Sequence, residues 1–158
     1  MNLNFEYCGT IKFALVFGFK NSFKETVRLL SRQLLNMKLN KILLCKDNNK
    51  VVGYGAVIEA SKKFSFAEKG DFVLGPYWVN PNFRNHGIGG KIVERLTHDL
   101  NSNVFAYICK TNTPSIVAMQ KVGYTIIGNM EKSGNKYILT QKSNEKNTLV
   151  VVKYTKEK

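Results

Sequence analysis

The spacing of apolar residues along this chain predicts a protein that combines helices with a β-sheet. The clearest helical pattern is the stripe Ile88, Ile92, Val93, Leu96 and Leu100, which lies on one helical face with Lys91, Glu94 and Arg95 pointing outward. Other segments are continuous or alternating apolar runs bounded by turn-forming residues, as strands are. Helices are predicted at residues 22–39, 88–100 and 114–121, and strands at residues 41–45, 50–60, 71–79, 104–109, 124–130, 136–142 and 148–154. Residues 1–19 are apolar enough for one further strand or two.

Residues with special backbone preferences separate these elements. The cluster Asp47-Asn48-Asn49 predicts a hairpin turn, and residues 61–70 predict a polar loop. Pro76 lacks the N–H that a sheet interior needs, so its strand must be bulged there or lie at an edge. Thr113 is expected to cap the helix that Gly123 ends.

The order of elements predicts the fold class. It is strand–helix–strands–helix–strand–helix–strands, which indicates an α/β (α+β) protein with a mixed, mostly antiparallel sheet. No linker or repeat interrupts it, so residues 1–158 are expected to form one domain. The last strand, residues 148–154, could pair across a dimer if it lies at an edge, so a monomer and a homodimer both stay open.

Composition narrows the class of protein. The chain is 44% hydrophobic and 22% charged, and no apolar run approaches the ~20 residues of a membrane span. The run Ile11–Phe19 is short, contains Lys12 and lacks a small-residue cleavage site, so we do not expect a signal peptide. Three widely spaced cysteines and two histidines form no disulfide or metal-ligand pattern, so we expect a reducing cytoplasm and no metal.

The net charge of +13 suggests an anionic partner, or only lysine-rich usage that keeps the protein soluble. The charges do not gather on one predicted helix, and aromatic residues are not interleaved with them as in base-stacking motifs. We therefore do not expect nucleic-acid binding, while a smaller anionic ligand stays open.

The stretch PNFRNHGIGG, residues 81–90, joins a predicted strand to a predicted helix. A glycine-rich turn before a helix exposes backbone N–H groups at the positive end of the helix dipole, and this arrangement binds anions. Arg84 adds a charge that can pair with phosphate. A dinucleotide fingerprint would need glycine where Ile92 stands, and a P-loop would need glycine at Asn85 and Ser or Thr at Ile92.

A third pattern fits this stretch. The segment RNHGIG, residues 84–89, resembles the R/Q-x-x-G-x-G/A loop of the GNAT superfamily of N-acetyltransferases, and its surroundings resemble that family's motif A. The segment NTPSIVAMQKVGY, residues 112–124, resembles motif B, one predicted strand further on. The resemblance covers about residues 41–137 and implies a GNAT-like sheet in which two strands splay apart to hold acetyl-CoA. The alternative for the loop is a flexible helix entry.

The resemblance also implies which residues contact the cofactor. Backbone groups of Trp78, Val79 and Asn80 would contact pantetheine, and Asn112 and Ser115 would contact the pantetheine arm or simply cap a helix. The pyrophosphate would be lined, mostly through N–H groups, by Arg84, Asn85, His86, Gly87, Ile88, Gly89 and Gly90.

Residues for the chemistry are less sharply indicated. The family transfers the acetyl group directly to an amine, so a base and a donor to the thioester carbonyl are needed, and the resemblance assigns the latter to the Val79 N–H. Asp71, thirteen residues before Arg84, and Glu59 are the candidate bases, although either could be an exposed strand-end carboxylate.

The candidate proton donors include a departure from the family pattern. Met119 stands where many members have a tyrosine that protonates the leaving sulfur. Solvent, Tyr77, Tyr107 or Cys109 would then serve, or no acid is needed. For Cys109 itself we expect a buried strand cysteine rather than an acyl-carrying nucleophile.

The expected activity is acetyl transfer from acetyl-CoA to a primary amine of a small molecule. The positive charge favours an anionic acceptor, such as a nucleotide-linked amino sugar, over polyamines or aminoglycosides. Alternatives are a CoA-binding module without turnover, a protein N-terminal or lysine acetyltransferase, and a basic nucleic-acid-associated protein.

Overall fold

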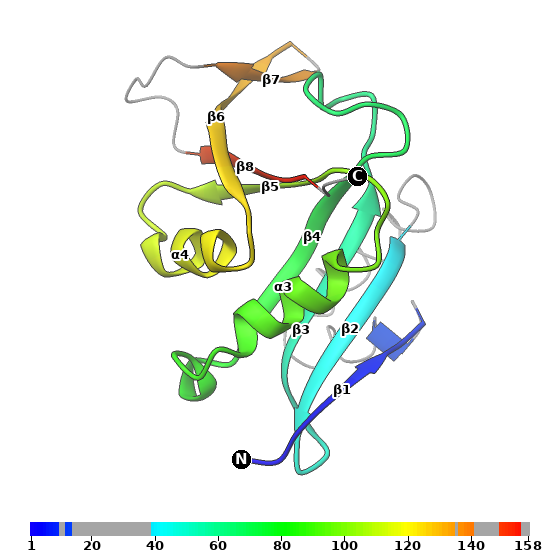
Figure 1. Cartoon of the computed structure of the whole chain (residues 1–158), viewed down its shortest axis with the longest axis vertical. Coiled ribbons are helices and arrows are strands. Elements are labelled where there is room, and N and C mark those ends of the chain that lie inside the picture. Colours follow the sequence, from blue (N-terminus) through cyan, green and yellow to red (C-terminus); the bar gives the residue numbers. More distant parts are fainter. Residues whose placement is uncertain (10–11, 14–38, 135, 141–148, 156–158) are drawn as a thin grey trace.

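The computed structural model describes residues 1–9, 12–13, 39–134, 136–140 and 149–155, and these build an eight-stranded sheet with helices packed on it (Figure 1). The strands are β1 (Leu3–Tyr7), β2 (Leu39–Asp47), β3 (Lys50–Glu59), β4 (Phe72–Val79), β5 (Val104–Cys109), β6 (Thr125–Ser133), β7 (Lys136–Thr140) and β8 (Leu149–Tyr154). The helices are a 3-10 turn at Pro81–Phe83, α3 (Ile88–Thr97) and α4 (Thr113–Lys121). The helix predicted at residues 22–39 lies outside the described residues, except for Leu39, which begins β2.

The sheet order is β1-β2-β3-β4-β5-β8-β6-β7, and β4 with β5 is its parallel pair. The predicted α+β class with a mostly antiparallel sheet is therefore confirmed. The predicted β2–β3 hairpin is confirmed as well. Asn48 and Asn49 have φ values of 46° and 66°, the left-handed pair that a two-residue hairpin turn requires.

β8 corrects a prediction. It does not offer an edge for a dimer, because it lies inside the sheet, antiparallel to β5 on one side and to β6 on the other. Its central residues Val151 and Val152 point to opposite faces and are both fully buried. A strand that is apolar on both faces is stabilised by being covered on both, which explains the interior position.

The loop between β3 and β4 was predicted as merely polar, yet it packs into the fold. Phe64, Phe66 and Ala67 join a buried cluster with Val73 and Phe105. The Tyr137 N–H on β7 donates to the Lys63 carbonyl over 2.6 Å, and the Ser65 N–H donates to the Tyr137 carbonyl over 2.9 Å. The loop thus reaches the edge strand β7, as the upper part of Figure 1 shows.

β4 is bulged, as Pro76 predicted. Gly55 pairs with Tyr77 and Val57 pairs with Leu74, so one more residue lies on β4 than on β3 across this step. On its other side, β4 pairs with β5 only at Phe72–Val104 and Val73–Phe105. From Leu74 onward the two strands therefore diverge, while β3 and β8 continue to hold their outer edges.

Helix α3 packs on the sheet beside this divergence. Its apolar stripe is confirmed, since Ile88, Ile92, Val93 and Leu96 are at most 1% exposed. Gly53 on β3 lets the helix approach closely, because a Cβ there would lie 3.0 Å from the Ile92 Cδ1 atom. Packing on this core therefore fixes the position of the N-terminal end of α3, which directly follows residues 84–87.

Candidate active site

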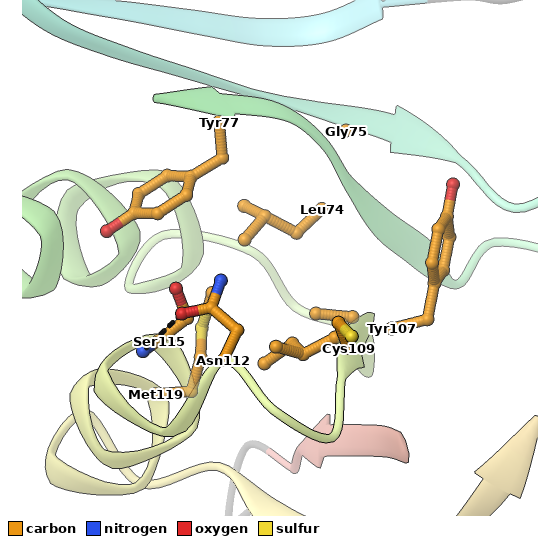
Figure 2. A pocket seen from close by; sticks show the side chains of 10 residues that line it. Leu74, Gly75, Tyr77, Tyr107, Cys109, Asn112, Ser115 and Met119 are labelled. Atoms are coloured by element: carbon orange, nitrogen blue, oxygen red, sulfur yellow. Dashed lines mark hydrogen bonds between the residues drawn. The ribbon is translucent and has the colours of Figure 1, made fainter. Parts of the chain in front are cut away.

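A cavity of about 220 Å³ opens where β4 and β5 diverge (Figure 2). Its walls come from both strands and from α4 with its cap residue. The lining residues are Leu74, Gly75, Tyr77, Ala106, Tyr107, Ile108, Cys109, Asn112, Ser115 and Met119. A parallel pair that stops pairing leaves backbone N–H and C=O groups facing the gap, so the cavity offers polar backbone beside a mixture of apolar and polar side chains.

The glycine-rich loop lies beyond the end of β4 that borders the cavity. Asn85 and Gly87 have φ values of 64° and 72°, which turn the chain sharply into α3. The first α-helical bond at this end is Lys91 N–H to the Gly87 carbonyl, 3.1 Å. The N–H groups of the preceding helical residues have no earlier carbonyl within the helix to donate to, so this end of α3 presents donors and a positive dipole.

Side chains hold the loop in this shape. The Arg84 Nε–H donates to the Val79 carbonyl over 3.2 Å, and His86 Nδ1 lies 2.7 Å from the Arg84 carbonyl oxygen. Because a carbonyl only accepts, the His86 Nδ1 atom carries the proton of this bond. Asn80, which caps the 3-10 turn by accepting from the Asn82 N–H, donates its own N–H to the Val52 carbonyl over 2.8 Å.

Two aromatic side chains of β4 differ in their positions. The Trp78 ring stacks on Tyr54 with centroids 5.6 Å apart, in a cluster separate from the one that contains α3. Tyr77 faces α3 instead, and its hydroxyl lies so close to Gly89 that an added Cβ there would be 2.0 Å from it. Burial raises the pKa of the Tyr77 phenol to about 12, so the group remains protonated near neutral pH.

Helix α4 forms the other wall of the cavity. Its cap is Asn112 rather than the predicted Thr113, because the Asn112 side-chain oxygen accepts from the Ser115 N–H over 3.3 Å (Figure 2). Thr113 lies inside the first turn, where Pro114 follows it. Met119, which is 2% exposed, fills the interior side of the same helix and borders the cavity.

The sequence profile of the Acetyltransferase (GNAT) family matches residues 15–124, more than half of the chain. The chain belongs to the GNAT acetyltransferase family. No curated protein sequence matches it closely enough to refine that assignment.

Solved structures of GNAT-like proteins share the fold at low sequence identity. The protein yncA from Salmonella typhimurium, solved with its cofactor acetyl-CoA, is 15% identical, with 100% of this chain and 96% of that one covered and a TM-score of 0.66. The ribosomal-protein-S18-alanine N-acetyltransferase from Escherichia coli is 11% identical, with 96% and 92% covered and a TM-score of 0.63. The N-acetyltransferase PseH from Campylobacter jejuni is 16% identical, with 98% and 99% covered and a TM-score of 0.57.

The two carboxylates considered as bases do not line the cavity of this GNAT protein. Asp71 precedes β4 at the end where β4 and β5 still pair, and it is 6% exposed. Its Oδ2 atom accepts from the Glu68 N–H over 2.8 Å, and its Oδ1 atom accepts from the Asn103 amide over 3.1 Å. Glu59 is exposed at the end of β3, opposite Phe72. Both acids therefore lie at the far end of β4 from the glycine-rich loop.

Cys109 corrects another expectation. It is exposed rather than buried, because β5 has no neighbour on the β4 side at this level. A hydrogen bond between its Sγ and the Thr111 Oγ1, 3.1 Å, lowers the pKa of the thiol. The continuous apolar run of β5 concealed this exposure, since the sequence does not show where β4 departs. Tyr107, two residues earlier on the same face, is likewise 45% exposed.

Two further findings concern the described part of the chain. No helix there is long and apolar enough to cross a membrane. No three His, Cys, Asp or Glu side chains come together there as a metal site would require.

Proposed function

We propose that this protein transfers the acetyl group of acetyl-CoA to a primary amine of a small molecule. The observation that carries the proposal is the continuity of three features: the gap between β4 and β5, the helix α4 that lines it, and the glycine-rich entry of α3 at its end. Elongated ligands with a phosphate group at one end match this combination of a gap between strands and a helix N-terminus.

The residues at the loop fit the pyrophosphate of CoA. An added Cβ at Gly87 would meet no atom within 4 Å, so the backbone at this turn is open to an approaching group. The N–H groups of Gly87, Ile88, Gly89 and Gly90 would then donate to phosphate, beside Asn85 and the ring of His86. The Arg84 guanidinium, anchored by its Nε, keeps its remaining N–H groups for an anion.

Contacts to the pantetheine arm would come from β4 and α4. The Asn80 N–H points to β3, so the alternation of a strand turns the N–H of Val79 to the opposite side, toward the gap. Its carbonyl accepts from Arg84, which agrees with that direction. The Trp78 side chain packs elsewhere and would contribute backbone only. Asn112 and Ser115 would contact the arm from α4, where Asn112 keeps an amide N–H after its cap bond.

When bound, acetyl-CoA supplies an activated acyl group as a thioester. The Val79 N–H would polarise the carbonyl of that group. Among the described residues that line the cavity, none is a carboxylate. We therefore propose that the amine enters neutral or loses its proton to water, and that neither Asp71 nor Glu59 is the base. Two cavity residues that could return a proton to sulfur are Tyr77, which is protonated near neutral pH, and Cys109.

The acceptor is proposed from charge. The net charge of +13 repels polycations and attracts anions, so a small anionic amine, such as a nucleotide-linked amino sugar, is favoured. A second candidate function is acetyl-CoA binding without turnover, and the observation behind it is Met119, whose thioether cannot donate a proton in the cavity.

Thermal unfolding with and without acetyl-CoA tests the proposal, with ATP as a polyanion control at the same salt concentration. A specific ligand at 100 times its Kd adds about 2.7 kcal/mol, which corresponds to a rise in Tm of roughly 5–10 °C for a chain of this size. The variant Arg84→Ala is expected to lose much of this rise. The variant Lys69→Ala removes an equal charge from the exposed β3–β4 loop and is expected to keep it. Equal shifts with ATP, or none with either ligand, would refute the cofactor assignment.

Turnover is the second step of the test. Release of CoA thiol in the presence of a panel of amines is expected if the protein is a transferase. Saturable acetyl-CoA binding with no thiol release from any small amine, peptide N-terminus or lysine would establish the binding module instead.

A further inference from the structure

Three aromatic rings form a stack at the border of the cavity. Phe64 of the β3–β4 loop lies between Tyr107 of β5 and Tyr137 of β7. The centroids of Phe64 and Tyr107 are 6.0 Å apart with an interplanar angle of 26°, and those of Phe64 and Tyr137 are 5.4 Å apart at 22°. Rings in this near-parallel arrangement support one another, so the stack defines the position of its outermost member.

Backbone hydrogen bonds fix the middle of the stack. The Tyr137 N–H and carbonyl bond to Lys63 and Ser65, the two neighbours of Phe64, and the Ser65 hydroxyl also donates to the Tyr137 carbonyl over 3.0 Å. The loop is therefore tied to β7 on both sides of the Phe64 ring. This arrangement makes Phe64 a rigid support for whatever packs on it.

Tyr107 is the member of the stack that lines the cavity. Figure 2 shows its ring nearly edge-on, beside Cys109 of the same strand, with β4 passing between it and Leu74 and Tyr77 in this view. Tyr107 is 45% exposed, lines the cavity and contacts Phe64, so the part of its side chain that its neighbours leave uncovered is accessible at the border of the cavity. Burial of its phenol, and the neighbouring Tyr137, raise the pKa of Tyr107, so it presents a neutral ring and a hydroxyl donor.

We propose that Tyr107 is the residue that selects the acceptor, and that it stacks on an amine carried by a ring with a flat apolar face. This inference rests on the proposed function and names the substrate class within it. A flat aromatic surface gains most from another flat surface, either an aromatic ring or the C–H face of a sugar ring. A flexible linear amine offers less area and loses more rotamer freedom on binding.

The charges around Tyr107 agree with this choice. None of the described residues that line the cavity is acidic, so a linear di- or polyamine finds no carboxylate there for a second ammonium group. Lys110 follows Cys109 at the end of β5, and Lys62 and Lys63 precede Phe64 in the loop, so three basic residues flank members of the stack along the chain. A ring amine that carries an anionic group fits this excess of positive charge as well as the ring.

The test compares acceptors in matched pairs, with release of CoA thiol as the signal. Benzylamine represents an aromatic ring, glucosamine and glucosamine 6-phosphate represent a sugar ring without and with an anionic group, and n-hexylamine represents a linear chain. The variants are Tyr107→Leu, Tyr107→Phe and Phe64→Leu. Tyr7→Leu is the matched control, since Tyr7 is 52% exposed on β1, where it bonds to Arg95 and not to the cavity.

Tyr107→Leu is expected to raise KM for the preferred ring amine by about two- to tenfold, with n-hexylamine changed less than twofold. Tyr107→Phe is expected to keep the preference, and Phe64→Leu to weaken it in part. The rise in Tm with acetyl-CoA is expected to stay unchanged in all variants, which separates acceptor stacking from cofactor binding.

Three results would overturn the inference. One is an unaltered protein that prefers n-hexylamine. Another is a Tyr107→Leu variant that loses ring and linear amines equally, or loses the acetyl-CoA shift. A third is a Tyr7→Leu control that changes acceptor preference as much as Tyr107→Leu does. If the unaltered protein shows the acetyl-CoA shift but turns over no amine, the proposed transferase function fails and this inference fails with it.

Discussion

The contact between Gly89 and Tyr77 leads to a sharp prediction about why this position is glycine. A Cβ at residue 89 would lie 2.0 Å from the Tyr77 hydroxyl oxygen and 3.3 Å from the Tyr77 Cζ atom. In Gly89→Ala the hydroxyl must therefore move by more than about 1 Å to reach an ordinary contact distance. Overpacking of this kind costs about 1–3 kcal/mol, while alanine in a helix recovers at most about 1 kcal/mol over glycine.

The net expectation for Gly89→Ala is a loss of about 1–2 kcal/mol in the free energy of unfolding, or roughly 2–8 °C in Tm. The double variant Tyr77→Phe/Gly89→Ala removes the clashing oxygen, so the alanine should cost nothing and can stabilise the helix relative to Tyr77→Phe alone. Urea unfolding of the four proteins measures the coupling, which is expected to be about 1–3 kcal/mol. Gly90→Ala is the control, because a Cβ there meets only the Val122 Cγ2 atom at 3.9 Å.

A Gly89→Ala protein as stable as the unaltered one would refute this steric reasoning. An alanine that costs the same with and without the Tyr77 hydroxyl would refute it as well. The same four proteins also separate two roles of the glycine. If close approach of phosphate requires glycine here, the rescued double variant will be stable and still lose the rise in Tm with acetyl-CoA. Stability and cofactor binding would then each require glycine at residue 89 independently of the other.

Three further predictions concern residues around the cavity. Asp71→Asn keeps one acceptor oxygen but loses the other, so it is expected to lower the free energy of unfolding by about 1–3 kcal/mol and to keep kcat within about threefold. A loss of kcat above 100-fold at unchanged stability would instead show that Asp71 is the catalytic base. Asn112→Ala removes the helix cap and is expected to lower the free energy of unfolding by about 1 kcal/mol, whereas Asn112→Asp keeps the cap and should be as stable as the unaltered protein. If the Asp variant is stable but neither variant shows the rise in Tm with acetyl-CoA, the Asn112 amide N–H binds the cofactor. The hydrogen bond with Thr111 lowers the pKa of Cys109, whereas burial raises the pKa of Cys45, so iodoacetamide near pH 8 should alkylate Cys109 first. Acetyl-CoA should slow the alkylation of Cys109. Peptide mass spectrometry that finds Cys45 alkylated first would contradict both the exposure of Cys109 and its lowered pKa.

The sequence was sufficient wherever a local pattern decides the structure. The stripe from Ile88 to Leu96, the asparagine turn at residues 48–49 and the bulge at Pro76 all follow from properties of single residues or short periods. Asn112 and Thr113 were harder to separate, because both are good caps and only the phase of the helix determines which one precedes it.

Contacts between residues far apart in the sequence determine the features that local patterns did not predict. The strand predicted at residues 148–154 is confirmed over Leu149–Tyr154, but its insertion between β5 and β6 depends on partners far along the chain. Phe64 and Phe66 are apolar residues within a polar loop, and that contrast was the available signal that the loop packs on something. Asp71 matches a functional spacing in the sequence, and its carboxylate also holds a loop through two hydrogen bonds, so its role as a base stays a prediction that the Asp71→Asn variant tests.

The exposure of β5 follows from a single change in its neighbour. While β4 pairs with β5, at Val104 and Phe105, the β5 side chains on both faces are buried. From Leu74 onward, just before the bulge at Gly75 and Pro76, β4 follows β3 and leaves β5, and alternate β5 residues become exposed at Tyr107 and Cys109. The same divergence opens the cavity and leaves Val79 without a pairing partner on β5. The candidate oxyanion donor, the ring proposed to select the acceptor and the accessible thiol are therefore consequences of one interrupted strand pair, and a change that restored pairing beyond Phe105 would remove all three together.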